Sequence, residues 1–153
     1  MRGLRAWAAL ILAVAAASGP VAAAGVRDIA LLRADGRRIS FRVEVATTTR
    51  ELSRGLMFCE NLPPDRGMLF DFGRDDVRPK MWMHDVPIAL DMLFVAGDGT
   101  IRAVHENARP GDDTVIASPV PVRAVLELAG GAVRVHRIAP GDRIVGAGFG
   151  PDP

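Results

Sequence analysis

Turn-forming residues divide the chain into short segments, and this spacing limits the possible folds more than any other feature of the sequence. Among its 153 residues are 16 glycines and 11 prolines. Pairs such as Asp35-Gly36 and Gly130-Gly131 separate stretches rich in valine, isoleucine, leucine and phenylalanine. About eight strand-like stretches recur at intervals of roughly ten residues. This pattern predicts a mainly β (α+β) fold, a compact antiparallel β-barrel or sandwich with one or two short helices.

One of these helices can be located from its end signals. In "TTTRELSRGLM", Thr48 is followed three residues later by Glu51, which is the pattern of a capping box. Gly55 is a suitable stop, because glycine adopts the backbone conformations that end helices. The sequence therefore predicts a helix from about Thr49 to Arg54.

The first 24 residues have the pattern of a secretory signal peptide. Arg2 and Arg5 precede an apolar stretch over residues 6–17, and Ala22 and Ala24 supply the small residues of an A-x-A cleavage site. The apolar stretch is shorter than the roughly 20 residues that a transmembrane helix needs. We therefore expect cleavage near Ala24, a periplasmic or secreted protein, and no stable membrane insertion after cleavage.

The remainder predicts a single β-rich domain over residues 25–146, followed by a Gly/Pro-rich tail, residues 147–153, that should be disordered. The chain has 19 basic and 18 acidic residues, and loss of the two arginines in the leader leaves a net charge of −1. No basic cluster extends beyond Arg37-Arg38, so a nucleic-acid partner is not expected. Cys59 is the only cysteine in the sequence, which excludes an intramolecular disulfide.

Three segments together resemble a known family. They are "RGLMFCENLPPDRGMLFDF", "MWMHDVPIALDMLFVAGDGTIRAVHENARPGD" and "VLELAGGAVRVHRIAPGDRI". Their order and motifs are similar to those of the domain of unknown function 192 family, over about residues 40 to 146. The resemblance implies a compact β-rich barrel or sandwich with one or two small helices, and no established reaction. It also implies that "AVRVHRI" is helical, whereas the alternation of this segment alone predicts a strand.

The chain departs from the family pattern at two places. Members usually carry a basic residue where this chain has Cys59, and lysine followed by asparagine where it has His84-Asp85. A thiol and an imidazole in these places suggest a metal or redox role, provided that the fold brings Cys59 and His84 together. Otherwise Cys59 is a quiet thiol or a small buried hydrophobic residue.

Two carboxylates stand in otherwise apolar strands. Asp91 interrupts the run from Ile88 to Val95, and Glu127 lies between Leu126 and Leu128. A buried carboxylate must be paired, hydrogen-bonded or protonated. Each could therefore be an internal tie, with Arg54 as the candidate partner of Asp91, or could line a ligand-binding cleft.

Trp82 and His84 are further candidates for a pocket wall, because alternate residues of a strand share a face. Five methionines lie in the mature chain: Met57, Met68, Met81, Met83 and Met92. Thioethers select Cu(I), but methionine is also a common filler of apolar cores.

Three classes of function follow from these residues. The favoured class is a non-catalytic binding or accessory module for an unknown small molecule or protein, because no set of catalytic residues can be assembled. The second is a hydrolase that uses Asp91 and Glu127 as a carboxylate pair. The third is a soft-metal (copper) binding protein. The sequence assigns no catalytic residue, no metal ligand and no cofactor, and the candidate ligand-binding residues are Asp91, Glu127, Arg54, Trp82 and His84.

Overall fold

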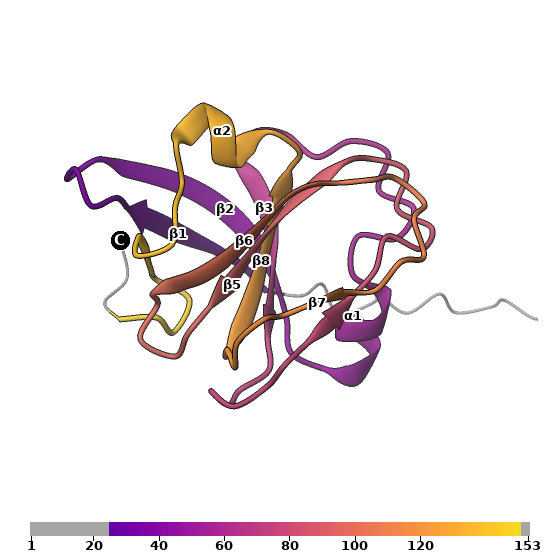
Figure 1. Cartoon of the computed structure of the whole chain (residues 1–153), viewed down its shortest axis with the longest axis horizontal. Coiled ribbons are helices and arrows are strands. Elements are labelled where there is room, and N and C mark those ends of the chain that lie inside the picture. Colours follow the sequence, from indigo (N-terminus) through magenta and orange to yellow (C-terminus); the bar gives the residue numbers. More distant parts are fainter. Residues whose placement is uncertain (1–24, 151–153) are drawn as a thin grey trace, which may run out of the picture.

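A computed structural model describes residues 25–150 of the chain, with two helices and nine strands in that range (Figure 1). The elements are β1 (Val26–Leu32), β2 (Arg38–Ala46), α1 (Thr49–Arg54), β3 (Arg66–Asp71), β4 (Lys80–Met81), β5 (Leu90–Val95), β6 (Ile101–Ala108), β7 (Ile116–Ala117), β8 (Ala124–Ala129), α2 (Ala132–His136) and β9 (Arg143–Val145). The expected signal peptide and residues 151–153 lie outside the described residues. Between residues 25 and 150, neither helix is long and apolar enough to cross a membrane.

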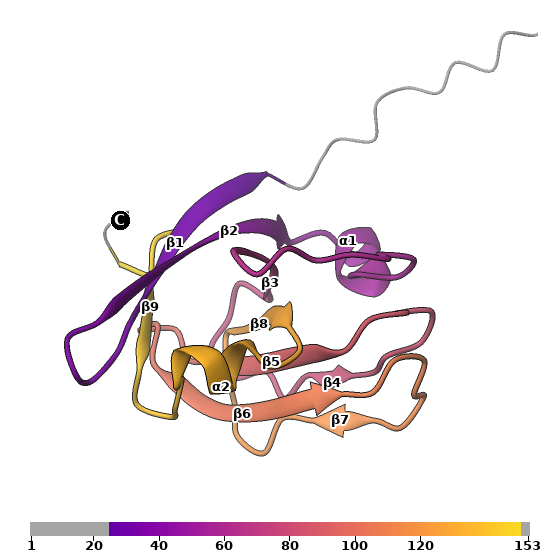
Figure 2. The same ribbon diagram turned by 90° about the horizontal axis from the view of Figure 1, so that it is seen from above.

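Seven strands form one curled sheet in the order β6-β5-β8-β3-β2-β1-β9, and β4 pairs with β7 in a small second sheet (Figure 2). The two ends of the large sheet approach each other, since Thr100 bridges Arg143 and the N–H of Ile144 donates to the carbonyl of Gly99 at 2.8 Å. The result is a half-barrel, which confirms the predicted mainly β architecture. Among the strands of residues 25–150, only β2 and β3 pair in parallel, because α1 carries the chain across between them.

Both faces of the large sheet are covered, so the central strands are buried on both sides. Every residue of β5 is buried. One face packs with α2 and β9 around Leu93, Leu126 and Ile144. The other packs with α1 and the small sheet around Met92, Phe94 and Val125. We call these the α2 face and the α1 face. Residues that alternate along β5 or β8 therefore point into different apolar cores.

Both expected helices are present. In α1, the Oγ1 of Thr48 accepts from the N–H of Glu51 at 3.3 Å, and the Glu51 carboxylate accepts from the N–H of Thr48 at 3.0 Å. This is the capping box that the sequence indicated. The segment "AVRVHRI" begins with α2, as the family resemblance implied and as its alternation did not.

The expectation of a disordered tail was wrong for residues 147–150. Phe149 is only 1% exposed. Its ring centroid lies 4.5 Å from the guanidinium carbon of Arg123, which also forms an ion pair with Asp71 at 2.8 Å. Burial of the Phe149 ring holds this Gly/Pro-rich segment against the domain, because the buried apolar area offsets the entropic cost of ordering a few residues.

Candidate functional site

Asp91 is an internal tie between three elements. Its side chain is fully buried on the α2 face of β5. One carboxylate oxygen accepts from the backbone N–H of Asn107, and the other accepts from the backbone N–H of Val133, both at 2.8 Å. Two charge-assisted hydrogen bonds to backbone donors satisfy a buried carboxylate without any cation.

Local backbone geometry explains why a carboxylate is needed there. Between the pairs Leu90–Ala108 and Met92–His105, β6 contains two residues against the single Asp91 of β5. In this bulge, Asn107 has a φ of 51° and its N–H points out of the regular ladder. The first turn of α2 also lacks a capping side chain of its own, because Gly131 stands at the N-cap. Asp91 supplies the acceptor both for the N–H of Asn107 in the bulge and for the N–H of Val133 in the first turn of α2.

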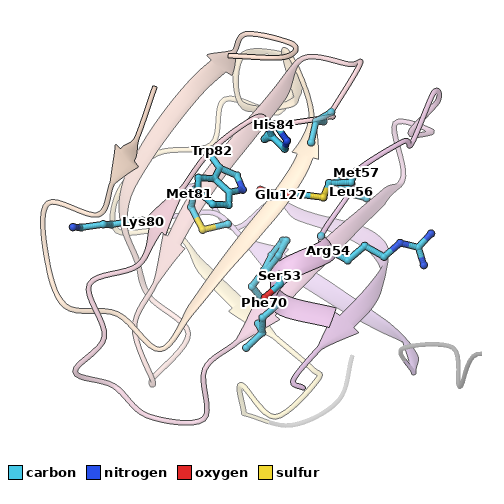
Figure 3. A pocket seen from close by; sticks show the side chains of 13 residues that line it. Ser53, Arg54, Leu56, Met57, Phe70, Lys80, Met81, Trp82, His84 and Glu127 are labelled. Carbon is cyan, nitrogen blue, oxygen red and sulfur yellow. The ribbon is translucent and has the colours of Figure 1, made fainter. Parts of the chain in front are cut away.

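The expected ion pair between Asp91 and Arg54 does not form. Arg54 ends α1, which covers the opposite face of the sheet. Its guanidinium extends away from the domain in Figure 3, and it makes no ion pair within residues 25–150. The prediction was wrong because the partners of Asp91 are backbone groups, which a search for cationic side chains cannot find.

Glu127 is buried without a partner. It is 3% exposed in β8, between Met68 of β3 and Met92 of β5. No residue between 25 and 150 forms a hydrogen bond or ion pair with its carboxyl group, whose oxygens keep a small accessible surface although the residue as a whole is buried. Burial raises the pKa of Glu127 to about 8. At neutral pH the side chain is therefore mainly a neutral carboxylic acid.

Glu127 lines a pocket of about 260 Å³ on the α1 face, which we call the Glu127 pocket (Figure 3). One wall comes from α1 and the turn that follows it, and the other comes from β4 and the residues after it. Its lining residues are Leu52, Ser53, Arg54, Gly55, Leu56, Met57, Phe70, Lys80, Met81, Trp82, His84, Val86 and Glu127. Apolar groups make up slightly more than half of its surface, and the lining includes a single acidic residue, a combination found in small-molecule sites.

Gly55 sets how closely α1 approaches the sheet at this pocket. A Cβ atom at this position would lie 2.9 Å from Cζ of Phe70, and the backbone has a φ of 48°. Both features favour glycine, since any other residue would meet the aromatic ring and strain the backbone. The glycine at the end of α1 therefore also fixes a wall of the pocket.

Trp82 and His84 stand together at the mouth of the pocket. Their ring centroids are 6.3 Å apart, and the indole is 55% exposed. The Nδ1 of His84 lies 2.8 Å from the Asp113 carboxylate, and Nε2 lies 3.6 Å from that of Asp85. The hydrogen bond to Asp113 and the negative charges of Asp85 and Asp113 raise the pKa of His84.

Four of the five sequence candidates therefore line one pocket: Glu127, Arg54, Trp82 and His84. Asp91 does not join them. In the antiparallel register of β5 and β8, Glu127 is opposite Met92 and Asp91 is opposite Leu128. The two carboxylates consequently project from opposite faces of the sheet, and the carboxylate pair expected for a hydrolase is not formed.

The residues expected for metal chemistry come together only in part. Met57, Met81 and His84 line the Glu127 pocket, whereas Met83 is completely buried and does not line it. Cys59 does not line the pocket, and its thiol donates to the carbonyl of Asn61 at 3.3 Å. In the part of the chain that is described, no group of three or more His, Cys, Asp and Glu side chains is placed to hold a metal ion.

Sequence reasoning did not select Phe70 for the site, and it considered Met57 only as one of five methionines that either bind copper or fill the core. Met57 comes from the turn after α1 and Phe70 from β3. Both belong to motifs that carried the family resemblance, Met57 to "GLMF" and Phe70 to "GMLF".

Comparisons with known proteins agree with this resemblance. The model of the family DUF192, described as "Uncharacterized ACR", matches residues 30–146. A crystal structure from Sinorhizobium meliloti 1021, described as a "putative transcription regulator", is 44% identical, with a TM-score of 0.80, covering 82% of this chain and 97% of that one. A protein of unknown function from Novosphingobium aromaticivorans DSM 12444 is 33% identical, with a TM-score of 0.76, covering 83% and 89%. A comparison with curated proteins found no match.

Proposed function

Because the chain belongs to the DUF192 family, for which no reaction is given, we propose a function from its own geometry: an exported binding module that holds a small molecule in the Glu127 pocket without transforming it. The observation that carries this proposal is that Glu127 lines the pocket as a buried acid whose carboxyl has no partner among residues 25–150.

A carboxyl in this position opposes stability. Its neighbours across the sheet are Met68 and Met92, and a leucine or methionine at position 127 would pack between them without a desolvation cost. Buried polar groups in folded proteins are normally hydrogen-bonded, so an unpartnered one needs a reason. A strongly shifted pKa in a pocket is characteristic of functional sites. A bound molecule that contacts Glu127 supplies that reason.

The surroundings of Glu127 support binding over catalysis. Hydrolysis by a carboxylate pair needs a second carboxyl group across the same cleft. Asp91 is on the other face of the sheet, and both of its oxygens are engaged by backbone N–H groups. His84 is at the mouth of the pocket and is held by Asp113 rather than directed to an exposed nucleophile.

Native mass spectrometry of protein purified from the periplasm tests the binding proposal. We expect a small molecule to be retained by the wild-type protein and lost from Glu127→Leu. Glu44→Leu is the matched control, because Glu44 is exposed on β2 and lies outside the pocket. Equal retention by both variants, or no retained molecule in any of the three proteins, would contradict the proposal.

The proposal of export is supported by the first 24 residues, which contain two arginines, a short apolar stretch and an A-x-A site. N-terminal sequencing of the periplasmic fraction should find a chain that begins near Gly25. An intact Met1 end in the cytosol would contradict export without affecting the binding proposal.

A soft metal ion is the second candidate occupant, favoured by the placing of Met57, Met81 and His84 around one pocket. Two thioethers and an imidazole suit Cu(I). Titration with Cu(I) under reducing conditions tests this candidate, and a 1:1 complex that depends on Met81 would favour it over an organic ligand.

A further inference from the structure

We infer that the molecule bound in the Glu127 pocket is an organic cation: one ammonium group on a small apolar body, held against the carboxylate of Glu127. This inference rests on the proposed binding function and specifies its ligand.

The first reason is that the chain provides no counter-ion for Glu127. Its cross-strand neighbours, Met68 and Met92, carry no charge. Three charged or titratable side chains line the pocket from the elements that cover it: Arg54 from α1, Lys80 from β4 and His84 from the segment after β4. None of the three forms an ion pair with Glu127.

The orientation of these three side chains explains why. In Figure 3, the side chains of Arg54 and Lys80 extend away from the pocket on opposite sides. His84 is engaged with Asp113 and Asp85 at the mouth. The carboxyl of Glu127 is therefore the one ionisable group inside the apolar part of the pocket, among the residues described. A cation from solution can take the place that no side chain fills.

The second reason is the chemistry of the walls. Trp82 and Phe70 contribute aromatic rings, and Met57 and Met81 contribute polarisable thioethers. Aromatic faces attract cations through their quadrupoles, most strongly where water is excluded. Thioether and methylene groups pack against an apolar body. An uncharged ligand could be held by an amide such as glutamine, whereas a carboxyl adds the ability to become an anion when a cation arrives.

The third reason limits the ligand to one positive charge. Arg54 and Lys80 line the pocket with side chains that extend away from it, and neither makes an ion pair within residues 25–150. A second positive charge on the ligand would find no second carboxylate, because Glu127 is the only acidic residue among the described residues that line the pocket. A compact monocation with an apolar remainder needs no second carboxylate, and the volume of about 260 Å³ accommodates it.

Binding of such a ligand must release a proton. The neutral carboxylic acid of Glu127 gives its proton to solvent as the ammonium enters, and a carboxylate–ammonium pair remains. Because burial raises the pKa of Glu127 to about 8, most of the protein molecules should release a proton on binding the ligand at pH 7. Affinity should then rise with pH up to about 8 and fall again at higher pH, where the ammonium group of the ligand loses its own proton. An uncharged ligand that accepts a hydrogen bond from the protonated acid would show the opposite dependence.

Isothermal titration calorimetry with benzylammonium and its uncharged analogue benzyl alcohol tests the inference. For the wild-type protein, we expect benzylammonium to bind at least tenfold more tightly than benzyl alcohol. Its affinity should rise several-fold from pH 6.5 to 7.5, and measurements in buffers of different ionisation enthalpy should report the released proton. Glu127→Gln should lose at least tenfold in affinity for benzylammonium, whereas the exposed control Glu44→Gln should lose none.

Two results would overturn the inference. If benzyl alcohol binds as tightly as benzylammonium and Glu127→Gln binds both, the pocket takes an uncharged ligand, and the proposed binding function stands without the cation. If benzylammonium does not bind, or binds without proton release, the ligand class is wrong. Native mass spectrometry of the periplasmic protein then decides the binding function independently. Glutamine resembles the protonated acid in shape and charge, and the proton-release measurement needs only the wild-type protein.

Discussion

Asp91 and Glu127 are close neighbours in the sheet and differ in almost everything that determines what a buried carboxyl does. They lie on the adjacent antiparallel strands β5 and β8, and they are 0% and 3% exposed. Asp91 points to the α2 face and accepts hydrogen bonds from the N–H groups of Asn107 and Val133. Glu127 points to the α1 face, has no partner among residues 25–150, and lines a pocket.

The comparison teaches that burial alone does not identify a functional acid. Both residues are carboxyls in apolar strands, and the sequence alone made each of them an equally good candidate for a functional site. The hydrogen-bond partners separate them, because a fully satisfied carboxylate holds structure together whereas an unsatisfied one opposes folding. Glu127 is therefore the residue around which a ligand site can be built, and Asp91 belongs to the scaffold.

The largest expected effect is on the pH dependence of stability at Glu127. Its folded-state pKa of about 8 is above the ordinary 4.5. The neutral acid is therefore favoured by folding. The associated stability is fully present below pH 4.5 and is lost as the pH rises to 8. Over that range the wild-type protein should lose about 5 kcal/mol relative to Glu127→Gln, which cannot ionise.

Denaturant unfolding of both proteins at several pH values between 4 and 9 measures this difference. Above pH 8 the difference should no longer change. If the free energies of unfolding of the wild-type protein and Glu127→Gln changed in parallel with pH, Glu127 would be ionised and stabilised in the folded protein. That result would remove its contrast with Asp91.

Removing the Asp91 carboxylate should give the next largest effect. Asp91→Ala leaves the N–H groups of Asn107 and Val133 without acceptors and opens a small cavity. We expect a loss of roughly 3 to 5 kcal/mol in the free energy of unfolding at pH 7. Asp91→Asn should cost less, about 1 to 3 kcal/mol, because its amide oxygen can still accept one of the two bonds. An Asp91→Ala protein as stable as the wild type would transfer the functional assignment to Asp91.

Two methionines allow a pocket position to be compared with a core position. Met83 is fully buried, and Met81 is partly exposed in the pocket. Met83→Leu should cost up to about 1.5 kcal/mol in urea unfolding, and Met81→Leu should cost less, because leucine nearly conserves volume at both positions. Neither substitution should change copper content after incubation with Cu(I). Loss of a 1:1 Cu(I) complex in Met81→Leu would favour a metal ion as the occupant of the Glu127 pocket.

The smallest expected effect is at Arg54. Because it makes no ion pair within residues 25–150 and its side chain extends into solvent, Arg54→Ala should change the free energy of unfolding by less than about 0.5 kcal/mol. Its effect should add to that of Asp91→Ala within about the same margin. Strong coupling between Asp91→Ala and Arg54→Ala in a double-mutant cycle would support the ion pair that the sequence suggested.

Much of the fold could be predicted from sequence, because its signals are local. Turn pairs such as Asp35-Gly36 marked strand ends, and the Thr48–Glu51 pattern located α1. Phe149 was the exception, since its packing under Arg123 depends on a contact 26 positions away in the chain.

The site could be predicted only in part, because its geometry depends on register. Asp91 and Glu127 were both recognisable as carboxyls in apolar strands. The face that each one occupies follows from the pairing of β5 with β8, and a shift of one residue would exchange those faces. Met57 and Phe70 reach the pocket from a turn and a strand that meet only in the folded protein, so no local pattern could reveal them.

Direct titration of the Glu127 carboxyl tests the central claim most closely. The ¹³C resonance of its side-chain carboxyl can be followed by NMR from pH 4 to 10, with Glu127→Gln to assign it. The contrast between a satisfied Asp91 and an unsatisfied Glu127 predicts a midpoint near 8. A midpoint near the ordinary 4.5 would show that Glu127 has a partner or free access to water, and would contradict its assignment as the buried acid of a ligand site.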